Sequence, residues 1–191
     1  MSDNPLARLQ SRILTEGTLV LGGVKDVKNL KNRLRSRLNK AFQAEVLCAD
    51  YGHLVWHQKR QTEIAVWGGV EINLDRDPKK LHFKRSDGAW FDFHMLLRPY
   101  AGDLTAHRGF LELLAYGYEI RFPPELGCDV RWLRFDLNPP GHDNDLRSVR
   151  AHFHPGDEDL QAPSPVLHPD EALDLLLSDL LQLPSKRRRP R

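Results

Sequence analysis

The chain has 191 residues, and its 28 Lys and Arg against 26 Asp and Glu give a formal net charge of +2. At about 150 residues per domain, this length predicts one main domain with an appendage. The 40% hydrophobic and 28% charged residues exclude a wholly disordered chain and a multi-span membrane protein. The amino terminus has no secretory pattern, and Cys48 and Cys128 have no metal-ligand or disulfide spacing. We therefore expect a cytoplasmic protein with reduced thiols and no contact with a membrane.

The N-terminal part predicts two helices on either side of a short apolar run. The first helix is expected over Leu6–Leu14, and the apolar run over Thr18–Leu21 ends at a pair of glycines. The second helix is expected over Val24–Phe42, where apolar residues recur at steps of three and four and form one stripe. Such a stripe docks on a core, and the rest of the helix then faces water.

The small net charge hides a strong segregation along the chain. Val24–Phe42 holds seven cations and one anion, and Lys186–Arg191 holds five cations, so the remaining residues carry a net charge of −9. This asymmetry is typical of a chain that presents cations to a polyanion, although a solvated surface helix explains the first segment equally well. As a nucleic-acid interface, the helix would contact phosphates without reading bases, through Lys28, Lys31, Arg33, Arg35, Arg37 and Lys40.

From Glu45 onward the pattern changes to short runs typical of β-strands. Two runs flank the turn residues Ser86–Gly88, which predicts a hairpin in which Phe83 faces Phe91. A polar group on one face of this hairpin, where a cross-strand His–Asp pair is an ordinary contact, comprises His82, Asp92 and His94. Further strands are expected over Phe110–Phe122, Val130–Leu137 and Ser148–His154.

Pro169 opens a final helix with acidic residues in its first turn and a wide leucine-rich face. The leucines are expected to cover one face of the sheet, and a contact with a protein partner or in a homodimer is the alternative. These elements predict an α+β fold, a central antiparallel sheet with helices at the N- and C-terminal ends. We divide the chain into an N-terminal helical segment with the basic helix (residues 1–43), an α+β domain (44–184) and a basic disordered tail (185–191).

The residues best suited to chemistry lie on the last two predicted strands. Side chains alternate between the faces of a strand, so polar residues two positions apart share a face. If the loop between the two strands makes them neighbours, one polar surface gathers Arg134, Asp136, Arg150, His152 and His154. Covering such a surface with helices is costly, so we expect it to face water or a ligand.

Three interpretations of this surface compete. In the first, which we adopt, His152 and His154 act as general base and acid on an RNA 2′-hydroxyl and 5′-oxygen. The arginines stabilise the phosphorane charge and Asp136 orients one imidazole, so neither a metal nor another cofactor is required. In the second, the two histidines are metal ligands, and Asp136, His142 or His168 completes the site. In the third, both histidines are surface residues without a role.

Short motifs in the C-terminal third carry a resemblance to a known family. They are Arg134-Phe135-Asp136, a proline- and histidine-containing loop through His142, and His152-Phe153-His154. Over residues 110–180 the chain resembles the small bacterial TumE-type family, described as toxins of toxin–antitoxin pairs. The basic N-terminal part has no counterpart in that family. The resemblance implies a bacterial toxin or defence context and an activity directed at RNA or growth, carried by Arg134, Asp136, His142, His152 and His154.

The sequence therefore predicts a bacterial cytoplasmic protein that binds nucleic acid, RNA above all, in a toxin or defence role. Its His-x-His strand has the residue types needed to cleave RNA. An alternative from another class is a non-catalytic adaptor that joins a nucleoprotein complex through the basic helix and the leucine-rich C-terminal helix. A further alternative is a small metal-dependent enzyme at the same histidines.

Overall fold

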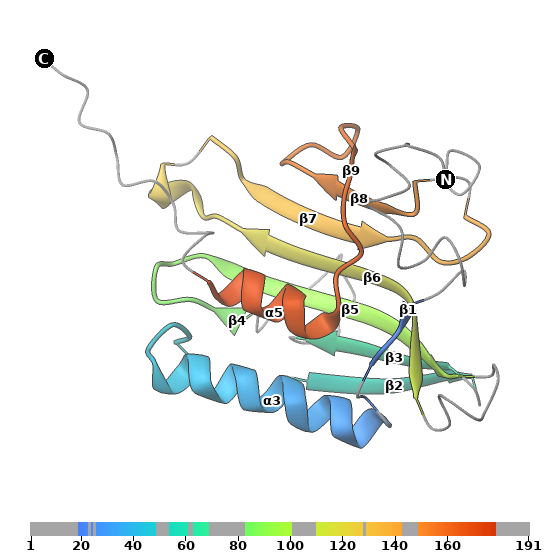
Figure 1. The fold of residues 1–191 in the computed structure, drawn as a ribbon. Helices are drawn as coiled ribbons and strands as arrows, with labels where there is room; N and C mark the ends of the chain where they lie inside the picture. Colours follow the sequence, from blue (N-terminus) through green and yellow to red (C-terminus); the bar gives the residue numbers. More distant parts are fainter. Residues whose placement is uncertain are drawn as a thin grey trace, which may run out of the picture.

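The fold is described from a computed structural model, which covers residues 19–22, 24, 26–48, 54–60, 63–68, 83–100, 110–127, 129–142 and 149–178. The helical elements are α3 (Val27–Gln43), the short 3-10 helix η1 (Pro124–Leu126) and α5 (Pro169–Leu177). The strands are β1 (Leu19–Val20), β2 (Leu54–Arg60), β3 (Glu63–Gly68), β4 (Phe83–Lys84), β5 (Trp90–Pro99), β6 (Leu111–Arg121), β7 (Trp132–Leu137), β8 (Ala151–His154) and β9 (Ala162–Pro163) (Figure 1). None of the helices in these ranges is long and apolar enough to cross a membrane.

The strands form one antiparallel sheet in the order β2-β3-β5-β6-β7-β8-β9, with β1 paired to β6 and β4 paired to β5. The central pair, β5 and β6, runs from Trp90 opposite Arg121 to Pro99 opposite Leu111. Neighbouring antiparallel strands need only short connections, so most of the sheet follows the order of the chain. The predicted α+β class, with a central antiparallel sheet and a helix from each end region, is confirmed.

One face of the sheet carries the hydrophobic core, and both α3 and α5 lie on that face (Figure 1). Phe91 and Tyr118 of the central strands are buried in the same apolar cluster as Leu34 of α3. Leu173 and Leu176 of α5 belong to this cluster too, so the leucines of the C-terminal helix cover the sheet, as predicted. The described parts of the N-terminal segment and of the α+β domain therefore share one core.

The local predictions from turn chemistry and periodicity are confirmed. Phe83 lies opposite Phe91 in the hairpin, with ring centroids 5.2 Å apart. Gly88 closes the turn at a φ of 90°, a conformation that glycine adopts without a steric penalty. The three later strands are present as β6, β7 and β8. The helix predicted over Leu6–Leu14, His82 and the basic C-terminal tail lie outside the described residues.

Helix α3 confirms the predicted amphipathic helix, and two of its six predicted phosphate-binding cations are engaged within the fold. Arg33 donates a hydrogen bond to the carboxylate of Asp170 in α5. Arg37 donates from Nε to Asp174 Oδ1 at 3.0 Å, and its Nη1 lies 3.5 Å from Asp170 Oδ1. The side chain of Asp170 is only 7% exposed, so its carboxylate depends on these arginines for compensation. Arg33 and Arg37 therefore have a structural role.

Reversing the charge of these two arginines is expected to destabilise the protein. The Arg33→Glu, Arg37→Glu variant should unfold with a free energy lower by about 1–3 kcal/mol, because Asp170 would lose its partners and meet like charges. The matched Lys28→Glu, Lys40→Glu variant alters exposed residues of the same helix and should stay within about 0.5 kcal/mol of the parent. Urea denaturation measures both values. Equal stability of the two variants would contradict the structural role.

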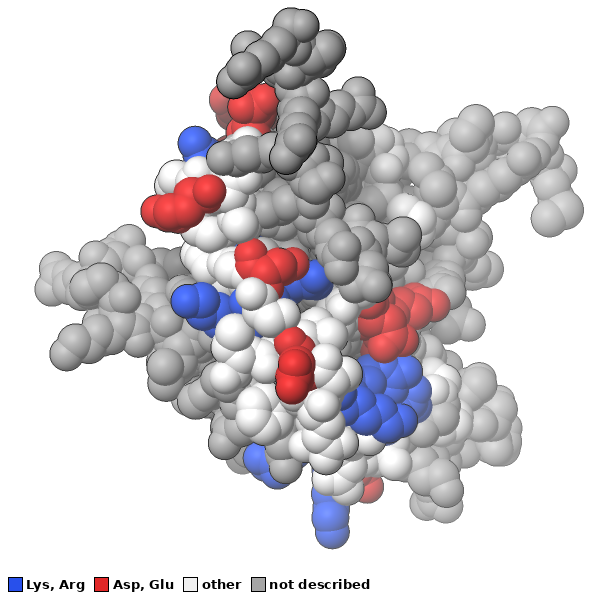
Figure 2. Space-filling view, turned by 90° about the vertical axis from the view of Figure 1, so that its left-hand side faces the viewer, with Lys and Arg blue, Asp and Glu red and all other residues white. Residues whose placement is uncertain are grey.

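Charges of both signs are interspersed on the side of the molecule that lies to the left in Figure 1 (Figure 2). A surface built for a polyanion would instead gather cations without neighbouring carboxylates. The interspersed pattern agrees with the ion pairs between α3 and α5, which neutralise part of the charge that the sequence places on the helix.

Candidate functional site

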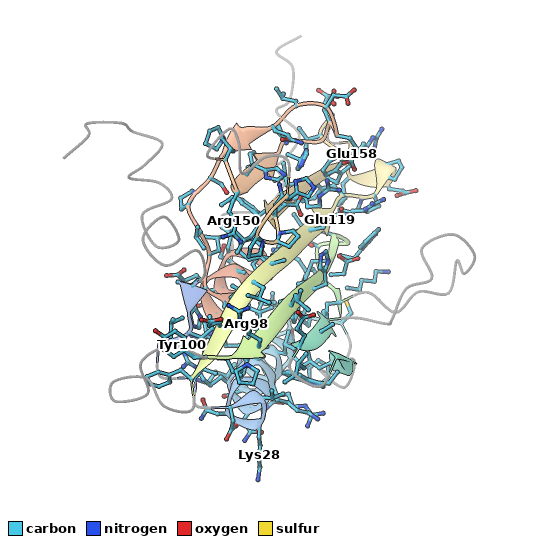
Figure 3. All side chains as sticks on the ribbon, turned by 90° about the vertical axis from the view of Figure 1, so that its right-hand side faces the viewer. Lys28, Arg98, Tyr100, Glu119, Arg150 and Glu158 are labelled. Carbon is cyan, nitrogen blue, oxygen red and sulfur yellow. The ribbon has the colours of Figure 1, made fainter. Side chains whose placement is uncertain are left out.

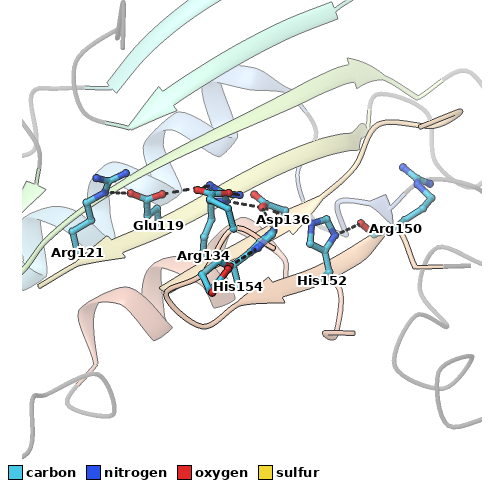
Figure 4. A network of polar contacts seen from close by, with 9 residues as sticks. Glu119, Arg121, Arg134, Asp136, Arg150, His152 and His154 are labelled. Carbon is cyan, nitrogen blue, oxygen red and sulfur yellow. Dashed lines mark hydrogen bonds and ion pairs between the residues drawn. The ribbon is translucent and has the colours of Figure 1, made fainter. Parts of the chain in front are cut away.

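The candidate site lies on the face of the sheet opposite the helices, where β6, β7 and β8 run side by side (Figure 4). Phe135 and Phe153, which face the core, lie opposite each other with ring centroids 4.8 Å apart. Side chains alternate, so the intervening residues of these strands project to the other face. There, Asp136 lies opposite His152 in β8, and Arg134 lies opposite His154. The two strands are neighbours, so the condition on which the shared polar surface depended is met.

Asp136, His152 and His154 form a compact cluster. Asp136 Oδ2 lies 3.3 Å from His154 Nε2 and 3.8 Å from His152 Nε2. The two imidazole rings meet edge to face, with centroids 4.9 Å apart. In the part of the chain that the structure describes, no other group of three His, Cys, Asp or Glu side chains comes together in this way. We call these three residues the His–Asp cluster.

Arg134 fixes the carboxylate of this cluster. Its Nε donates to Asp136 Oδ2 at 2.7 Å, and its Nη1 and Nη2 donate to Glu158 Oε1 and Oε2 at 2.9 and 2.7 Å. Burial alone would lower the pKa of Arg134, but the hydrogen bonds to Glu158 and Asp136 hold that pKa above its ordinary value. The same bonds lower the pKa of Glu158. A planar guanidinium can donate to two carboxylates at once, so Arg134 holds Asp136 in one orientation.

The ion pairs continue from Arg134 across the sheet to β6 (Figure 4). Glu119 Oε2 lies 3.9 Å from Arg134 Nη1, and Glu119 also accepts a hydrogen bond from Arg121. Burial raises the pKa of Glu119, and the hydrogen bond from Arg121 opposes that rise. The sequence prediction omitted Glu119, Arg121 and Glu158. The strand alternation that puts Tyr118 in the core also puts Glu119 and Arg121 on the polar face, so that signal was present for two of them.

The two histidines are buried, which differs from the predicted open polar surface. The side chains of His152 and His154 are 4% and 2% exposed, whereas that of Asp136 is 15% exposed. The chain after β8 folds back toward the cluster, since the carbonyl of Asp157 lies 3.2 Å from His154 Nδ1 and Glu158 pairs with Arg134. Strand β9 also pairs with the outer edge of β8. Asp136 is therefore the most exposed member of the cluster.

Burial has an electrostatic consequence for His152. Desolvation lowers the pKa of its imidazole, and the nearby carboxylate of Asp136 opposes this effect. Its Nδ1 lies 3.4 Å from the carbonyl oxygen of Arg150, which can only accept a hydrogen bond. Both ring nitrogens of His152 therefore face an oxygen that accepts hydrogen bonds, since Nε2 lies 3.8 Å from Asp136 Oδ2.

The positions of the two rings bear on the predicted acid–base pair. A base and an acid that act on one phosphodiester must reach the attacking and the leaving oxygen, on opposite sides of the phosphorus. Both Nε2 atoms instead point toward one carboxylate oxygen, Asp136 Oδ2. This geometry favours the metal-ligand interpretation of His152 and His154 over the acid–base one.

The other residues considered for this site lie apart from the cluster. Arg150, labelled in Figure 3, donates to the carbonyl oxygens of Asn138 and Leu114 at 2.9 and 3.1 Å. Its guanidinium therefore links the backbone of β6 to the backbone that follows β7. His142 is exposed in the turn after β7. His168 caps the N-terminus of α5 by accepting a hydrogen bond from the Asp170 N–H. Neither His142 nor His168 completes the group with Asp136.

His94 and Asp92 of the second polar group share the polar face of the sheet. Asp92 lies opposite Glu119, and His94 lies opposite Gly117, which in turn lies opposite Asp136. The exposed ring of His94 lies over Gly117, where a Cβ atom would come within 2.3 Å of His94 Cε1. The absence of a side chain at Gly117 therefore leaves space for the imidazole of His94 on this face of the sheet.

The basic helix and the His–Asp cluster lie on opposite faces of the sheet. Helix α3 packs on the core face, whereas Glu119 and Arg134 project from the other. Lys28 projects from the start of α3, far from Glu119 and Glu158 (Figure 3). The structure therefore does not bring the predicted phosphate-binding cations together with the histidines. Comparisons of this chain with models of protein families, with curated proteins and with solved structures found no match.

Proposed function

We propose that the protein is a bacterial enzyme that cleaves RNA at the cluster of Asp136, His152 and His154. The observation that carries this proposal is the convergence of both imidazoles on one carboxylate, which Arg134 fixes from behind. Groups held this rigidly on neighbouring strands are typical of a site for catalysis. A protein without such chemistry would have little reason to bury two imidazoles beside an anion.

Aromatic and basic side chains next to the cluster support a single-stranded nucleic acid as the substrate. Trp90 and Trp132 flank Arg121 on the polar face. The guanidinium carbon of Arg121 lies 5.4 Å from the ring centroid of Trp90, and that of Arg134 lies 5.2 Å from the ring centroid of Trp132. Aromatic rings and arginines on an open sheet face are the groups on which unpaired bases stack.

The biological context of the proposal comes from the sequence. The resemblance to TumE-type toxins rests on Arg134, Asp136, His142, His152 and His154, and it supports a cytoplasmic toxin or defence role. Of these residues, His142 lies in a separate turn, so the resemblance supports the other four as the working group. The cations of α3 that do not pair with α5 would hold a different stretch of the polynucleotide, because the helix packs on the other face.

The test is cleavage of a labelled single-stranded RNA by the full chain and by a His152→Ala, His154→Ala variant. The double variant should lose about 10²–10⁴-fold in cleavage rate, because the groups that assist proton transfer or position the phosphate are gone. Its affinity for the same RNA should fall far less than its cleavage rate, since stacking residues outside the cluster contribute to that binding. His142→Ala serves as the matched control and should cleave like the parent. Parental cleavage by the double variant would refute the proposal.

A further inference from the structure

The distance between Asp136 and His154 matches that between two ligands of one metal ion. Two ligand atoms bound at about 2.0–2.1 Å to a tetrahedral ion lie roughly 3.3–3.4 Å apart. Asp136 Oδ2 and His154 Nε2 are 3.3 Å apart, and Asp136 Oδ2 and His152 Nε2 are 3.8 Å apart. One ligand atom from each of the three residues lies within 4.8 Å of the other two, so the three side chains converge on one point.

The outer hydrogen bonds orient both imidazoles as metal ligands require. His152 Nδ1 lies 3.4 Å from the carbonyl oxygen of Arg150, and His154 Nδ1 lies 3.2 Å from the carbonyl oxygen of Asp157. In the tautomer that carries its proton on Nδ1, each ring can donate to this carbonyl while its Nε2 lone pair coordinates a cation. A histidine that gives one ring proton to a carbonyl and its other nitrogen to a metal is the common arrangement in metal sites.

The electrostatics of the cluster favour a cation at its centre. Both Nε2 atoms lie near Asp136 Oδ2, so a cation placed between them would meet one carboxylate oxygen and two imidazole nitrogens. Among the described residues, the ion-paired groups and Asp92 beside them comprise four carboxylates (Asp92, Glu119, Asp136 and Glu158) and two guanidiniums (Arg121 and Arg134). A phosphodiester would be repelled by this surplus of negative charge, whereas a divalent ion would neutralise it and attract the phosphate.

We infer that Asp136, His152 and His154 bind one divalent transition-metal ion, of the zinc or manganese type. Two imidazoles and one carboxylate are a ligand set for such ions and leave coordination positions for water or a substrate oxygen. Those positions would face the side of Asp136, which is the more exposed member. The inference deepens the proposed function, because the ion would bind the scissile phosphate and activate a water molecule, but metal binding itself requires no substrate.

The test is metal binding by the full chain without RNA. The protein is stripped with a chelator, incubated with Zn²⁺ or Mn²⁺, passed through a desalting column and assayed for metal by mass spectrometry. The parent should retain about one ion per chain. Asp136→Asn, His152→Gln and His154→Gln should each weaken binding by more than the about 10–100-fold that an outer hydrogen bond contributes. Co²⁺ spectra provide a second readout, since absorption bands of a bound Co²⁺ report its coordination geometry.

Two controls keep the outcomes separate. His142→Ala, which removes an exposed imidazole outside the cluster, should bind metal like the parent. Circular dichroism and thermal unfolding in chelator establish that each variant is folded before its metal content is compared. Substoichiometric metal in the parent, or equal binding by an Asp136→Asn, His152→Gln, His154→Gln variant, would overturn the inference. A parent that cleaves RNA but retains no metal would overturn the inference while upholding the enzyme, and metal binding without cleavage would do the reverse.

Discussion

Arg134→Ala is expected to weaken metal binding by the full chain by about 10–100-fold, the range typical of a residue that holds a ligand in place. The guanidinium donates to Asp136 Oδ2 at 2.7 Å and to both oxygens of Glu158. Without it, the carboxylate of Asp136 turns freely and Glu158 is released from the cluster. Titration of the apo protein with Zn²⁺, in competition with a chromophoric chelator, measures the change.

The Arg134→Lys variant tests whether metal binding depends on the shape of the Arg134 side chain or only on its positive charge. A lysine retains the positive charge but cannot span Asp136 and Glu158 with a planar fork, so we expect most of the loss to remain. Arg121→Ala is the matched control, because it removes a more exposed arginine of the same face that has no bond to Asp136. Its affinity should change by less than about threefold, in line with a screened surface pair. Full affinity in Arg134→Ala would contradict the positioning role.

Phe91→Ala is expected to lower the free energy of unfolding by about 3–5 kcal/mol, the range for removal of a buried aromatic ring. Phe91 has no exposed surface, and its ring lies 5.2 Å from that of Phe83 in the core that α3 and α5 cover. Deleting the ring leaves a cavity, because the strands on both sides of β5 hold the backbone in place. Guanidinium denaturation of the apo protein measures the loss.

The exposed Lys84 provides the comparison for Phe91 in the same hairpin. Lys84→Ala shortens a side chain on β4 that projects into water, and its effect should stay within about 0.5 kcal/mol. A loss below about 1 kcal/mol for Phe91→Ala would mean that the hairpin is not part of the core. The pair of variants thus tests which residues of this hairpin face the helices.

Local patterns in the sequence predicted the elements whose residues interact over short distances. The apolar stripe through Leu34 predicted α3, and the turn residues before Gly88 predicted the pairing of Phe83 with Phe91. The alternation along β7 and β8 predicted that Asp136, His152 and His154 would share a face if the two strands were neighbours, which they are. These features follow from the periods of helix and strand, which are local properties of the backbone and do not depend on the rest of the fold.

These local patterns could not predict contacts between residues that are far apart in the sequence. The seven cations from Val24 to Phe42 suggested a free basic surface, yet Arg33 and Arg37 pair with Asp170 and Asp174, about 137 positions along the chain. Similarly, Arg150 was grouped with the histidines by parity, but its guanidinium binds main-chain carbonyls. The sequence shows the charge of each side chain, but it does not show which opposite charge the fold places next to it.

The sequence by itself determined the fold class, the helices α3 and α5, the hairpin of β4 and β5, the strands β6 to β8, and the residue types of the His–Asp cluster. Only the tertiary structure decided that the basic helix and the cluster lie on opposite faces, that both imidazoles are buried, and that their Nε2 atoms face one carboxylate. The physical reason is one of distance. Periodicity and turn chemistry act within a few residues, whereas burial and electrostatic pairing depend on strands and loops that meet only when the sheet is complete.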